Sequence, residues 1–444
     1  MNDKNYINFH ILISHSPSNL NRDDMNMQKT ATFGGTRRVR VSSQSLKRAM
    51  RTSAYYADYL GQSSDRTRQL GSLAEKYIKE LNEKFPKDLI TDVIKKITGI
   101  TESWTSSKIN SALTESFSEE QVTEIFKYLD VTKADSKTKI TLKNINEQLG
   151  KKLPEDQVAS VVKRVSLIAI KADEQLGAVA AWSLAEVEKY CQLYQQLQEQ
   201  NPDLKAFEKA WNNAVDKKKL IDNKTQLMLF RAALQNSQDI ALSGRMATSG
   251  IMTNVDAALA VAHAITTHTV DGDIDWFTAV DDLNQETGET GSAHLDTTEF
   301  SAGVFYRYAS LNIRQLQENL GAVDRQQALD IAAHVLHMLA TIVPTAKQNA
   351  FAAFNLADFA FVAFSDQPIS LANAFENPVK LKGQGFLTPS IEAFVSYHQV
   401  IYQAFGLNND PQACFSTKNC SMELDNCMGS DFIKLKEWIK HNGA

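Results

Sequence analysis

Residues 7–14, INFHILIS, decide the fold because two kinds of side chain alternate along them. One set is Ile7, Phe9, Ile11 and Ile13, and the other is Asn8, His10, Leu12 and Ser14. Successive side chains of a strand point to opposite faces. The stretch therefore predicts a β-strand with one buried face.

The residues that follow predict a loop, a turn, a second strand and a helix. A polar loop covers residues 14–29, and the Phe-Gly-Gly at 33–35 is a turn signal. Residues 36–41 alternate again, which indicates an extended segment. Ser42 is a good N-cap residue for one helix over 43–60, SQSLKRAMRTSAYYADYL.

This part of the chain is strongly basic. Between Met25 and Asp58 there is no acidic residue but seven basic ones: Lys29, Arg37, Arg38, Arg40, Lys47, Arg48 and Arg51. The whole chain has a formal net charge of -5, so the remainder sums to -12. A cationic segment in an acidic chain indicates a polyanionic partner, most commonly nucleic acid, although a solvated basic face without a partner is the alternative.

The bulk composition is that of an ordinary globular protein. The 444 residues allow about two or three domains. With 43% hydrophobic and 22% charged residues, we expect a soluble chain, and no apolar run is long enough to span a bilayer. The N-terminus lacks the pattern of a signal peptide, and four cysteines make no disulfide scaffold, so we expect a cytoplasmic protein.

The segment 62–235 has a helical pattern and is rich in Lys, Glu and Gln. One apolar stripe at helical spacing is Leu70, Leu73, Tyr77, Ile78 and Leu81. Ser118 and Gln121 form a capping box before another apolar stripe. We expect an all-helical insertion.

Strand patterns return after Ser243. We expect a short helix capped by Asn254, with Val255, Ala258, Leu259, Ala262 and Ile265 on one face. Strands are predicted over 273–281, 299–313 and 357–365, and a helix capped by Asp324 separates the last two. Without the insertion the order is strand, helix, strand, strand, helix, strand. This predicts an α+β protein with an RRM-like (ferredoxin-like) antiparallel sheet backed by two helices.

Several of these segments closely resemble one known family. They are residues 13–18, 20–29, 37–50, 240–250, 262–268, 273–282, 300–301 and 303–308. The family is CasC, the backbone subunits of type I-E CRISPR Cascade complexes. The resemblance covers about the first 60 residues and most of 236–407, but neither the insertion nor the tail after residue 407.

The resemblance implies a hand-like subunit. Residues 1–61 would be the first part of the palm, 62–235 the fingers, 236–282 the thumb and the return to the palm, and 283–407 the second part of the palm. Residues 408–444 would be a C-terminal tail and helix. Several copies would line up along one CRISPR RNA, each displacing a base, and present the spacer to invading DNA. Further partners would be other Cascade subunits and, indirectly, a helicase-nuclease; no catalysis and no cofactor are implied.

The matching positions imply which residues bind RNA. The backbone would be held by Arg22, Lys29, Ser42, Gln44, Lys47 and Arg48, and Arg51 extends the same predicted helix face at a spacing of three and four residues. Met246 would displace the base, with Thr278 nearby. Independently of the resemblance, Lys, Arg, hydroxyl and amide groups suit phosphates and read no sequence. Core packing is the alternative interpretation of Met246.

Metal sites are weakly indicated. Asp271, Asp273 and Asp275 alternate like the start of a calcium loop, but Trp276 stands where glycine is needed. The spacing of Cys414, Cys420 and Cys427 is unlike that of structural zinc sites. The histidines His263, His268, His334 and His337 are better explained by packing or solvent exposure.

Two other functions stay open from the residues. Asp23 and Asp24 lie in the basic loop, where an RNA-guided ribonuclease could use them, and His15 could act as the base of a repeat-processing nuclease. Neither has a complete set of catalytic partners in the sequence. The third possibility is a general RNA-binding module.

Overall fold

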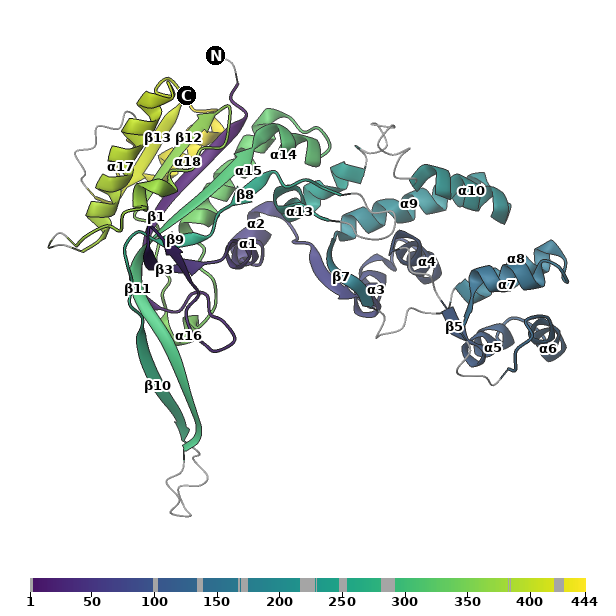
Figure 1. Ribbon diagram of the computed structural model, residues 1–444. Helices are drawn as coiled ribbons and strands as arrows, with labels where there is room; N and C mark the ends of the chain where they lie inside the picture. Colours follow the sequence, from purple (N-terminus) through teal and green to yellow (C-terminus); the bar gives the residue numbers. More distant parts are fainter. Residues whose placement is uncertain are drawn as a thin grey trace. The chain divides into compact units, whose positions relative to one another are not determined.

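The computed structural model describes residues 3–98, 103–133, 139–166, 168, 175–215, 228, 230–246, 254–280, 292–381, 383, 385–418 and 427–444. The chain forms two compact units (Figure 1). The sheet unit comprises Met1–Ser63, Gln235–Gly244 and Asp256–Ala444, and the helical unit comprises Ser64–Leu234 and Arg245–Val255. No helix within these ranges is both long enough and apolar enough to cross a membrane.

The sheet unit is built on an antiparallel sheet with the order β13-β12-β1-β11-β9-β3-β2, and β8 and β10 also pair with β11. Its strands are β1 (Tyr6–Ser18), β2 (Thr30–Phe33), β3 (Thr36–Val41), β8 (Leu259–Val261), β9 (Ala264–Thr266), β10 (Asp273–Val280), β11 (Ser292–Asn312), β12 (Phe359–Ser365) and β13 (Gln412–Ser416). A mixed helix-and-sheet architecture with an antiparallel sheet is therefore confirmed.

Helices cover both faces of this sheet (Figure 1). The helices of the unit are α1 (Ser43–Arg51), α2 (Ala54–Leu60), α13 (Gln238–Ser243), α14 (Ile313–Asn319), α15 (Arg325–Thr341), α16 (Gln348–Phe351), α17 (Leu387–Ala404) and α18 (Phe432–Lys440), with the short 3₁₀ helix η3 (Ala372–Phe375). The core on one face contains residues of α2, α15 and α18, and the core on the other contains residues of α17 and η3.

The prediction that β1 has one buried face is therefore wrong. Ile7 and Phe9 lie in the core with α15, as expected, but His10 and Leu12 on the other face are equally buried. Leu12 belongs to the core beneath α17, and the His10 ring lies 5.4 Å from that of Phe394 on the same helix. The sequence gives no local sign of this second layer, because α17 follows β1 by more than 360 residues.

Three other predicted elements differ from the structure. The helix over 43–60 is two helices, because the Ser53 side chain accepts a hydrogen bond from the backbone of Tyr56 and caps a new one. The helix after Asn254 is instead the strands β8 and β9 on β11 and β3. The tail after residue 407 is part of the sheet unit, since β13 extends the sheet and α18 packs on α15. The cap at Asp324 and the strand β12 are confirmed.

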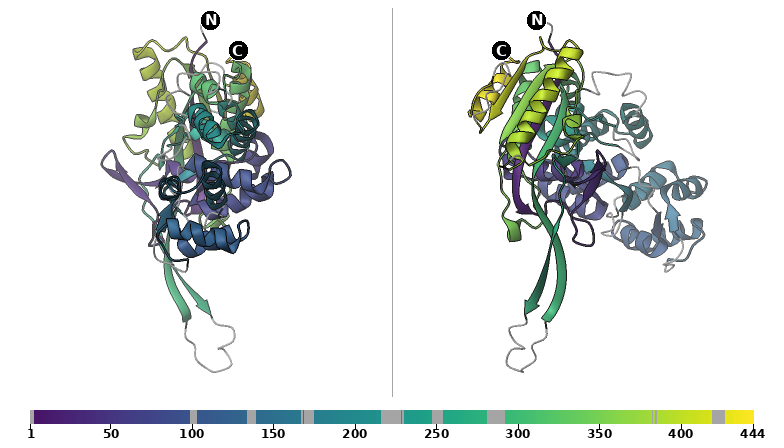
Figure 2. Two further views of the ribbon diagram at one scale, coloured as in Figure 1. Left: turned by 90° about the vertical axis from the view of Figure 1, so that its right-hand side faces the viewer. Right: turned by 60° about the vertical axis from the view of Figure 1, so that its left-hand side comes forward.

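One end of β11 leaves the sheet with β10 as a two-stranded ribbon (Figure 2). Residues 301–312 of β11 pair with β1, whereas Asp273 to Val280 of β10 pair with the segment from Phe300 back to Ser292. On β10 the side chains of Ile274 and Trp276 are 57% and 67% exposed. The ribbon is thus a projecting arm with apolar side chains at its surface.

The helical unit contains two hydrophobic cores. Its elements are β4 (Asp65–Gln69), α3 (Leu70–Leu81), α4 (Lys87–Thr98), β5 (Ser103–Thr105), α5 (Ser106–Thr114), α6 (Glu119–Tyr128), β6 (Lys139–Thr141), α7 (Leu142–Leu149), α8 (Glu155–Ser166), β7 (Gln175–Trp182), α9 (Leu184–Gln200) and α10 (Leu204–Val215). The 3₁₀ helix η1 (Ala233–Asn236) contains the point where the chain passes to the sheet unit. The prediction of an all-helical insertion is therefore wrong, because β4 pairs with β7 and β5 pairs with β6. The capping box at Ser118 is confirmed.

Candidate nucleic-acid interface

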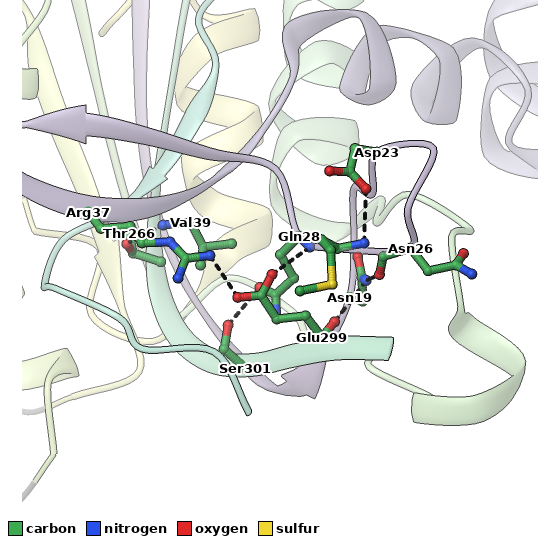
Figure 3. A network of polar contacts seen from close by, with 10 residues as sticks. Asn19, Asp23, Asn26, Gln28, Arg37, Val39, Thr266, Glu299 and Ser301 are labelled. Carbon is green, nitrogen blue, oxygen red and sulfur yellow. Dashed lines mark hydrogen bonds and ion pairs between the residues drawn. The ribbon is translucent and has the colours of Figure 1, made fainter. Parts of the chain in front are cut away.

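The loop 19–29 is fixed on strand β11 by the carboxylate of Glu299 (Figure 3). Glu299 is 3% exposed. Its Oε2 accepts the backbone N–H of Gln28 at 3.0 Å, and its Oε1 pairs with Nη2 of Arg37 on β3 at 2.7 Å. The Asn19 side-chain amide donates to the Glu299 carbonyl at 2.9 Å and to that of Asn26 at 3.1 Å. One buried acid therefore joins the loop, the β2–β3 hairpin and the arm strand.

A second side chain joins this loop to the start of helix α1. The backbone N–H of Ser42 donates to Oδ1 of Asn21 at 2.9 Å, and the N–H of Lys29 donates to the carbonyl of Asn21 at the same distance. Ser42 also caps α1, because its hydroxyl accepts the N–H of Ser45 at 3.2 Å. The N-terminus of α1, where the helix dipole is positive, is thereby held beside the loop.

The expected RNA-binding residues of the sheet unit therefore come from connected elements. Arg22 in the loop and Gln44 and Arg48 on α1 are exposed, and Lys29 and Ser42 are half-buried. The Arg22 guanidinium donates to the side-chain oxygen of Asn26, within its own loop. These groups present cationic and amide donors at the surface, which suits phosphate oxygens.

Two residues of the basic helix face are less free than the sequence suggests. Lys47 is half-buried, and its Nζ donates to the carbonyl of Leu259 on β8 at 3.3 Å. Arg51, in the last turn of α1, is also half-buried. The most exposed cation on this helix face is therefore Arg48.

Three arginines of the cationic segment have structural roles. Arg38 is fully buried and donates to the carbonyls of Thr266 and Phe375, both at 2.9 Å; burial lowers the pKa of its guanidinium. Arg37 is paired with Glu299. Arg40 donates to the carbonyl of Thr30 at 3.0 Å. Sequence reasoning counted these as surface charge and missed Asn19, Asn21 and Glu299, whose roles depend on contacts distant in the chain.

Met246 is 82% exposed, which argues against core packing, and it belongs to the helical unit. The preceding residue, Arg245, is buried with its Nη1 and Nη2 2.6 and 2.9 Å from the two carboxylate oxygens of Glu186. Residues 247–253 of the expected thumb loop lie outside the described residues. Thr278 is on β10 opposite Leu295, and its side chain is not among those described.

The candidate nuclease residues have other contacts. Oδ1 of Asp23 accepts the backbone N–H groups of Met25 and Met27, at 2.9 and 3.0 Å, and so shapes the loop. Asp24 is exposed. His15 is 2% exposed; burial and the nearby Arg307 guanidinium lower its pKa to about 3.

The proposed metal ligands form no site in the described part of the chain, where no group of three His, Cys, Asp or Glu residues could hold an ion. Cys414 is buried in β13, and Cys427, which is exposed, bridges it through the backbone. Cys420 lies outside the described residues. Asp273 and Asp275 are exposed on the arm strand β10.

Comparison with known proteins gives a family. A model described as CT1975-like protein (Cas_CT1975) matches residues 7–166 and 132–441. The chain belongs to this family of Cas proteins. The expectation of a Cas protein is thus confirmed at the level of the family. No curated protein matches the chain.

Among solved structures, the fold is similar to that of a chain from a "CRISPR RNA-guided surveillance complex, pre-nicking". The two chains are 24% identical, the TM-score is 0.61, and the match covers 98% of this chain and 100% of the other. A chain from a "CRISPR RNA-guided surveillance complex" is 20% identical with a TM-score of 0.49, over 98% and 99% of the two chains.

The hydrogen bond between Glu299 and Gln28 should be sensitive to a substitution at Gly272, which precedes β10. A Cβ on Gly272 would lie 2.2 Å from Oε1 of Glu299, so Gly272→Ala should push the carboxylate away from Gln28. Overpacking of this kind costs roughly 1–3 kcal/mol. We expect the Gln28 amide, followed by hydrogen exchange, to exchange about ten- to a hundredfold faster, which corresponds to ~1.4–2.8 kcal/mol.

A double-mutant cycle provides the control. If Gly272 acts through the carboxylate, Gly272→Ala should have little further effect in a Glu299→Ala background. Unchanged protection of the Gln28 amide in Gly272→Ala, or full additivity of the two substitutions, would contradict the role given to Glu299.

Proposed function

We propose that this protein is a non-catalytic backbone subunit of a type I-E Cascade surveillance complex, and that it binds CRISPR RNA through loop 19–29 and the start of α1. The observation that carries the proposal is the network around Glu299 and Asn21, which holds the loop and the helix N-terminus together. Membership of the CT1975-like family and the fold of the similar surveillance-complex chain support it. The resemblance of residues 13–18, 20–29, 37–50, 240–250, 262–268 and 273–282 to CasC supports type I-E.

The strand order supports an RRM-like palm. The central strands lie in the order β12-β1-β11-β9, with α1 and α2 between β1 and β9 in the chain and α15 between β11 and β12. This is the arrangement expected of a split βαβ unit. The helical unit would be the fingers, and residues 236–282 would comprise the thumb and the return to the palm.

The chemistry of the loop suits RNA of any sequence. Arg22, Lys29 and Arg48 can neutralise phosphates, and Gln44 and the backbone at the start of α1 supply neutral donors. Such contacts position a strand without reading its bases, as a subunit that holds arbitrary spacers requires. Met246 would then lie against a displaced base, and Thr278 of the arm would be a further RNA-binding residue.

The proposed partners follow from this role. They are the CRISPR RNA, the target DNA strand that pairs with it, further copies of this chain, the other Cascade subunits and, indirectly, a helicase-nuclease, all in the cytoplasm. The proposal that the chain is not a nuclease is supported by Asp23, whose Oδ1 already accepts two backbone N–H groups, and by the burial of His15.

The test is the salt dependence of RNA binding. We expect Arg22→Ala combined with Arg48→Ala to weaken binding to all sequences alike, and to flatten the slope of log K against log salt by about 1.4, from ~0.7 per lost phosphate contact. Arg314→Ala combined with Lys380→Ala removes the same charge from exposed positions elsewhere in the sheet unit and should leave the slope near the wild-type value.

An equal slope for both double variants would contradict an RNA site at the loop. The same RNA, incubated with the wild-type protein in magnesium and in manganese, should remain intact. Cleavage products that disappear in Asp23→Ala or Asp24→Ala would overturn the non-catalytic assignment.

A further inference from the structure

The ribbon formed by β4 and β7 in the helical unit has two different faces. Asp65 faces the core: it lies opposite the buried Trp182, and Oδ1 and Oδ2 are both 2.8 Å from Nζ of Lys76 on α3. Arg66 follows it on the opposite face, and Arg66 and Arg68 are both exposed, with a shift of the strand register between Thr67 and Gln69. Arg68 makes no hydrogen bond or ion pair with any residue in the described part of the chain.

The chain before Met246 is fixed on this same ribbon. Arg66 lies opposite Ala181 of β7, and the carbonyl of Ala181 accepts a hydrogen bond from Nη1 of Arg245 at 3.4 Å. Arg245 is held by its bidentate ion pair with Glu186, and its backbone exchanges hydrogen bonds of 2.8 and 3.0 Å with Val255. The residue before the exposed Met246 is therefore held against β7, the strand that pairs with β4.

The side chains of Arg66, Arg68 and Met246 suit the two parts of a nucleotide, its phosphate and its base. The carboxylates of Asp65 and Glu186 are each used by a cation of the unit itself, so neither is placed to pair with Arg68. A guanidinium binds a phosphate through two parallel hydrogen bonds and reads no sequence. A thioether side chain packs against any base. Phosphate-binding and base-binding groups therefore belong to elements that are connected through Ala181 and Arg245.

We infer that Arg66 and Arg68 form a second phosphate-binding surface, which holds the backbone of the guide RNA beside the nucleotide that Met246 contacts. The inference rests on the proposed function but concerns the helical unit. In that unit, Met246 is the one residue to which the proposed function assigns a role in RNA binding. The same chemistry could bind the phosphates of the target DNA, and the arms of the experiment separate these two sources.

The experiment uses the full chain and single-stranded RNA of guide length in several unrelated sequences. We expect Arg66→Ala combined with Arg68→Ala to flatten the slope of log K against log salt by about 1.4, at ~0.7 per contact, for every sequence. Lys127→Ala combined with Lys209→Ala removes the same charge from exposed helix positions of the same unit and should leave the slope unchanged.

A neutral methylphosphonate, placed at one position of the RNA at a time, locates the contact. At some positions next to the displaced bases, the methylphosphonate should weaken RNA binding by the wild-type protein. At the same positions it should have no effect on RNA binding by the Arg66/Arg68 variant. A merely structural role of the arginines would leave this pattern in place.

The outcomes distinguish this inference from the proposed function. If the Arg22/Arg48 variant loses RNA binding and the Arg66/Arg68 variant retains the wild-type slope, only the second surface is overturned. If the Arg66/Arg68 variant binds RNA normally but its RNA complex captures complementary DNA more weakly, the surface binds the target strand and the assignment to the guide is wrong. If neither variant changes RNA binding, the proposed function fails as well.

Discussion

Replacing Glu186 by Gln should lower the unfolding free energy of the helical unit by about 3 kcal/mol or more. The side chains of Glu186 and Arg245 are only 4% and 1% exposed, and their contacts are 2.6 and 2.9 Å. Removing one partner leaves a buried charge without compensation, which costs about 3–5 kcal/mol. Urea unfolding followed by tryptophan fluorescence reports this unit, because Trp182 and Trp211 lie in its core.

An exposed ion pair of the same unit is the matched control. Glu155 and Lys205 are 71% and 78% exposed, so Glu155→Gln should change stability by less than about 1 kcal/mol. Replacing both members of the buried pair, as Glu186→Leu with Arg245→Met, should recover much of the stability lost in Glu186→Gln, since no isolated charge remains. A loss below about 1 kcal/mol in Glu186→Gln would show that the pair is not what fixes the chain before Met246.

The predictions that held depend on neighbours in the sequence. Asp324 caps α15 through its hydrogen bond to the Gln327 backbone at 2.8 Å, three residues away. The turn at 33–35 uses Gly34 and Gly35 with φ of 58° and 74°, values that glycine adopts readily, and it leads into β3 as expected. Local chemistry was sufficient in both cases.

The predictions that failed concern contacts that the local pattern does not contain. Leu259 and Ile265 stand at helical spacings, but pairing with β11 makes each part of a strand. Arg38 reads as a surface charge, yet carbonyls contributed by β9 and by the segment at Phe375 surround it. Glu299 lies 271 residues from Gln28, so no pattern around the loop could reveal its anchor. Tertiary structure decided each of these positions.

Two buried histidines should make the protein sensitive to mild acid. His10 and His15 are 0% and 2% exposed, and burial, the larger cause in each case, lowers the pKa of both to about 3; the charges of His398 and Arg307, respectively, add to it. Nδ1 of His10 lies 2.8 Å from the Tyr306 hydroxyl, and Nε2 of His15 lies 3.2 Å from Nη2 of Arg307. Neither site favours a protonated imidazole.

The sign of the effect follows from the two states of the chain. At a pH above 6.5, the ordinary pKa of histidine, the imidazoles are neutral whether the chain is folded or unfolded. In this range the two histidines do not lower the free energy of unfolding. Below it the unfolded chain binds protons that the folded chain does not bind until about pH 3, so stability falls throughout this window. Each histidine should cost about 2 kcal/mol between pH 7.5 and 5, and the pair about 4 kcal/mol.

Urea unfolding of the sheet unit between pH 7.5 and 5 measures this loss before most carboxylates titrate. His10→Phe keeps an aromatic ring beside Phe394 but removes one proton site, so its stability should depend less on pH than that of the wild type, by about 2 kcal/mol over the range. The variant should be less stable at pH 7.5, because the Tyr306 hydroxyl loses its hydrogen bond to His10. His441→Asn, at an exposed position, should keep the wild-type pH dependence. A wild-type loss below about 1 kcal/mol, or equal pH dependence in His10→Phe and wild type, would mean that His10 takes up its proton in the folded protein.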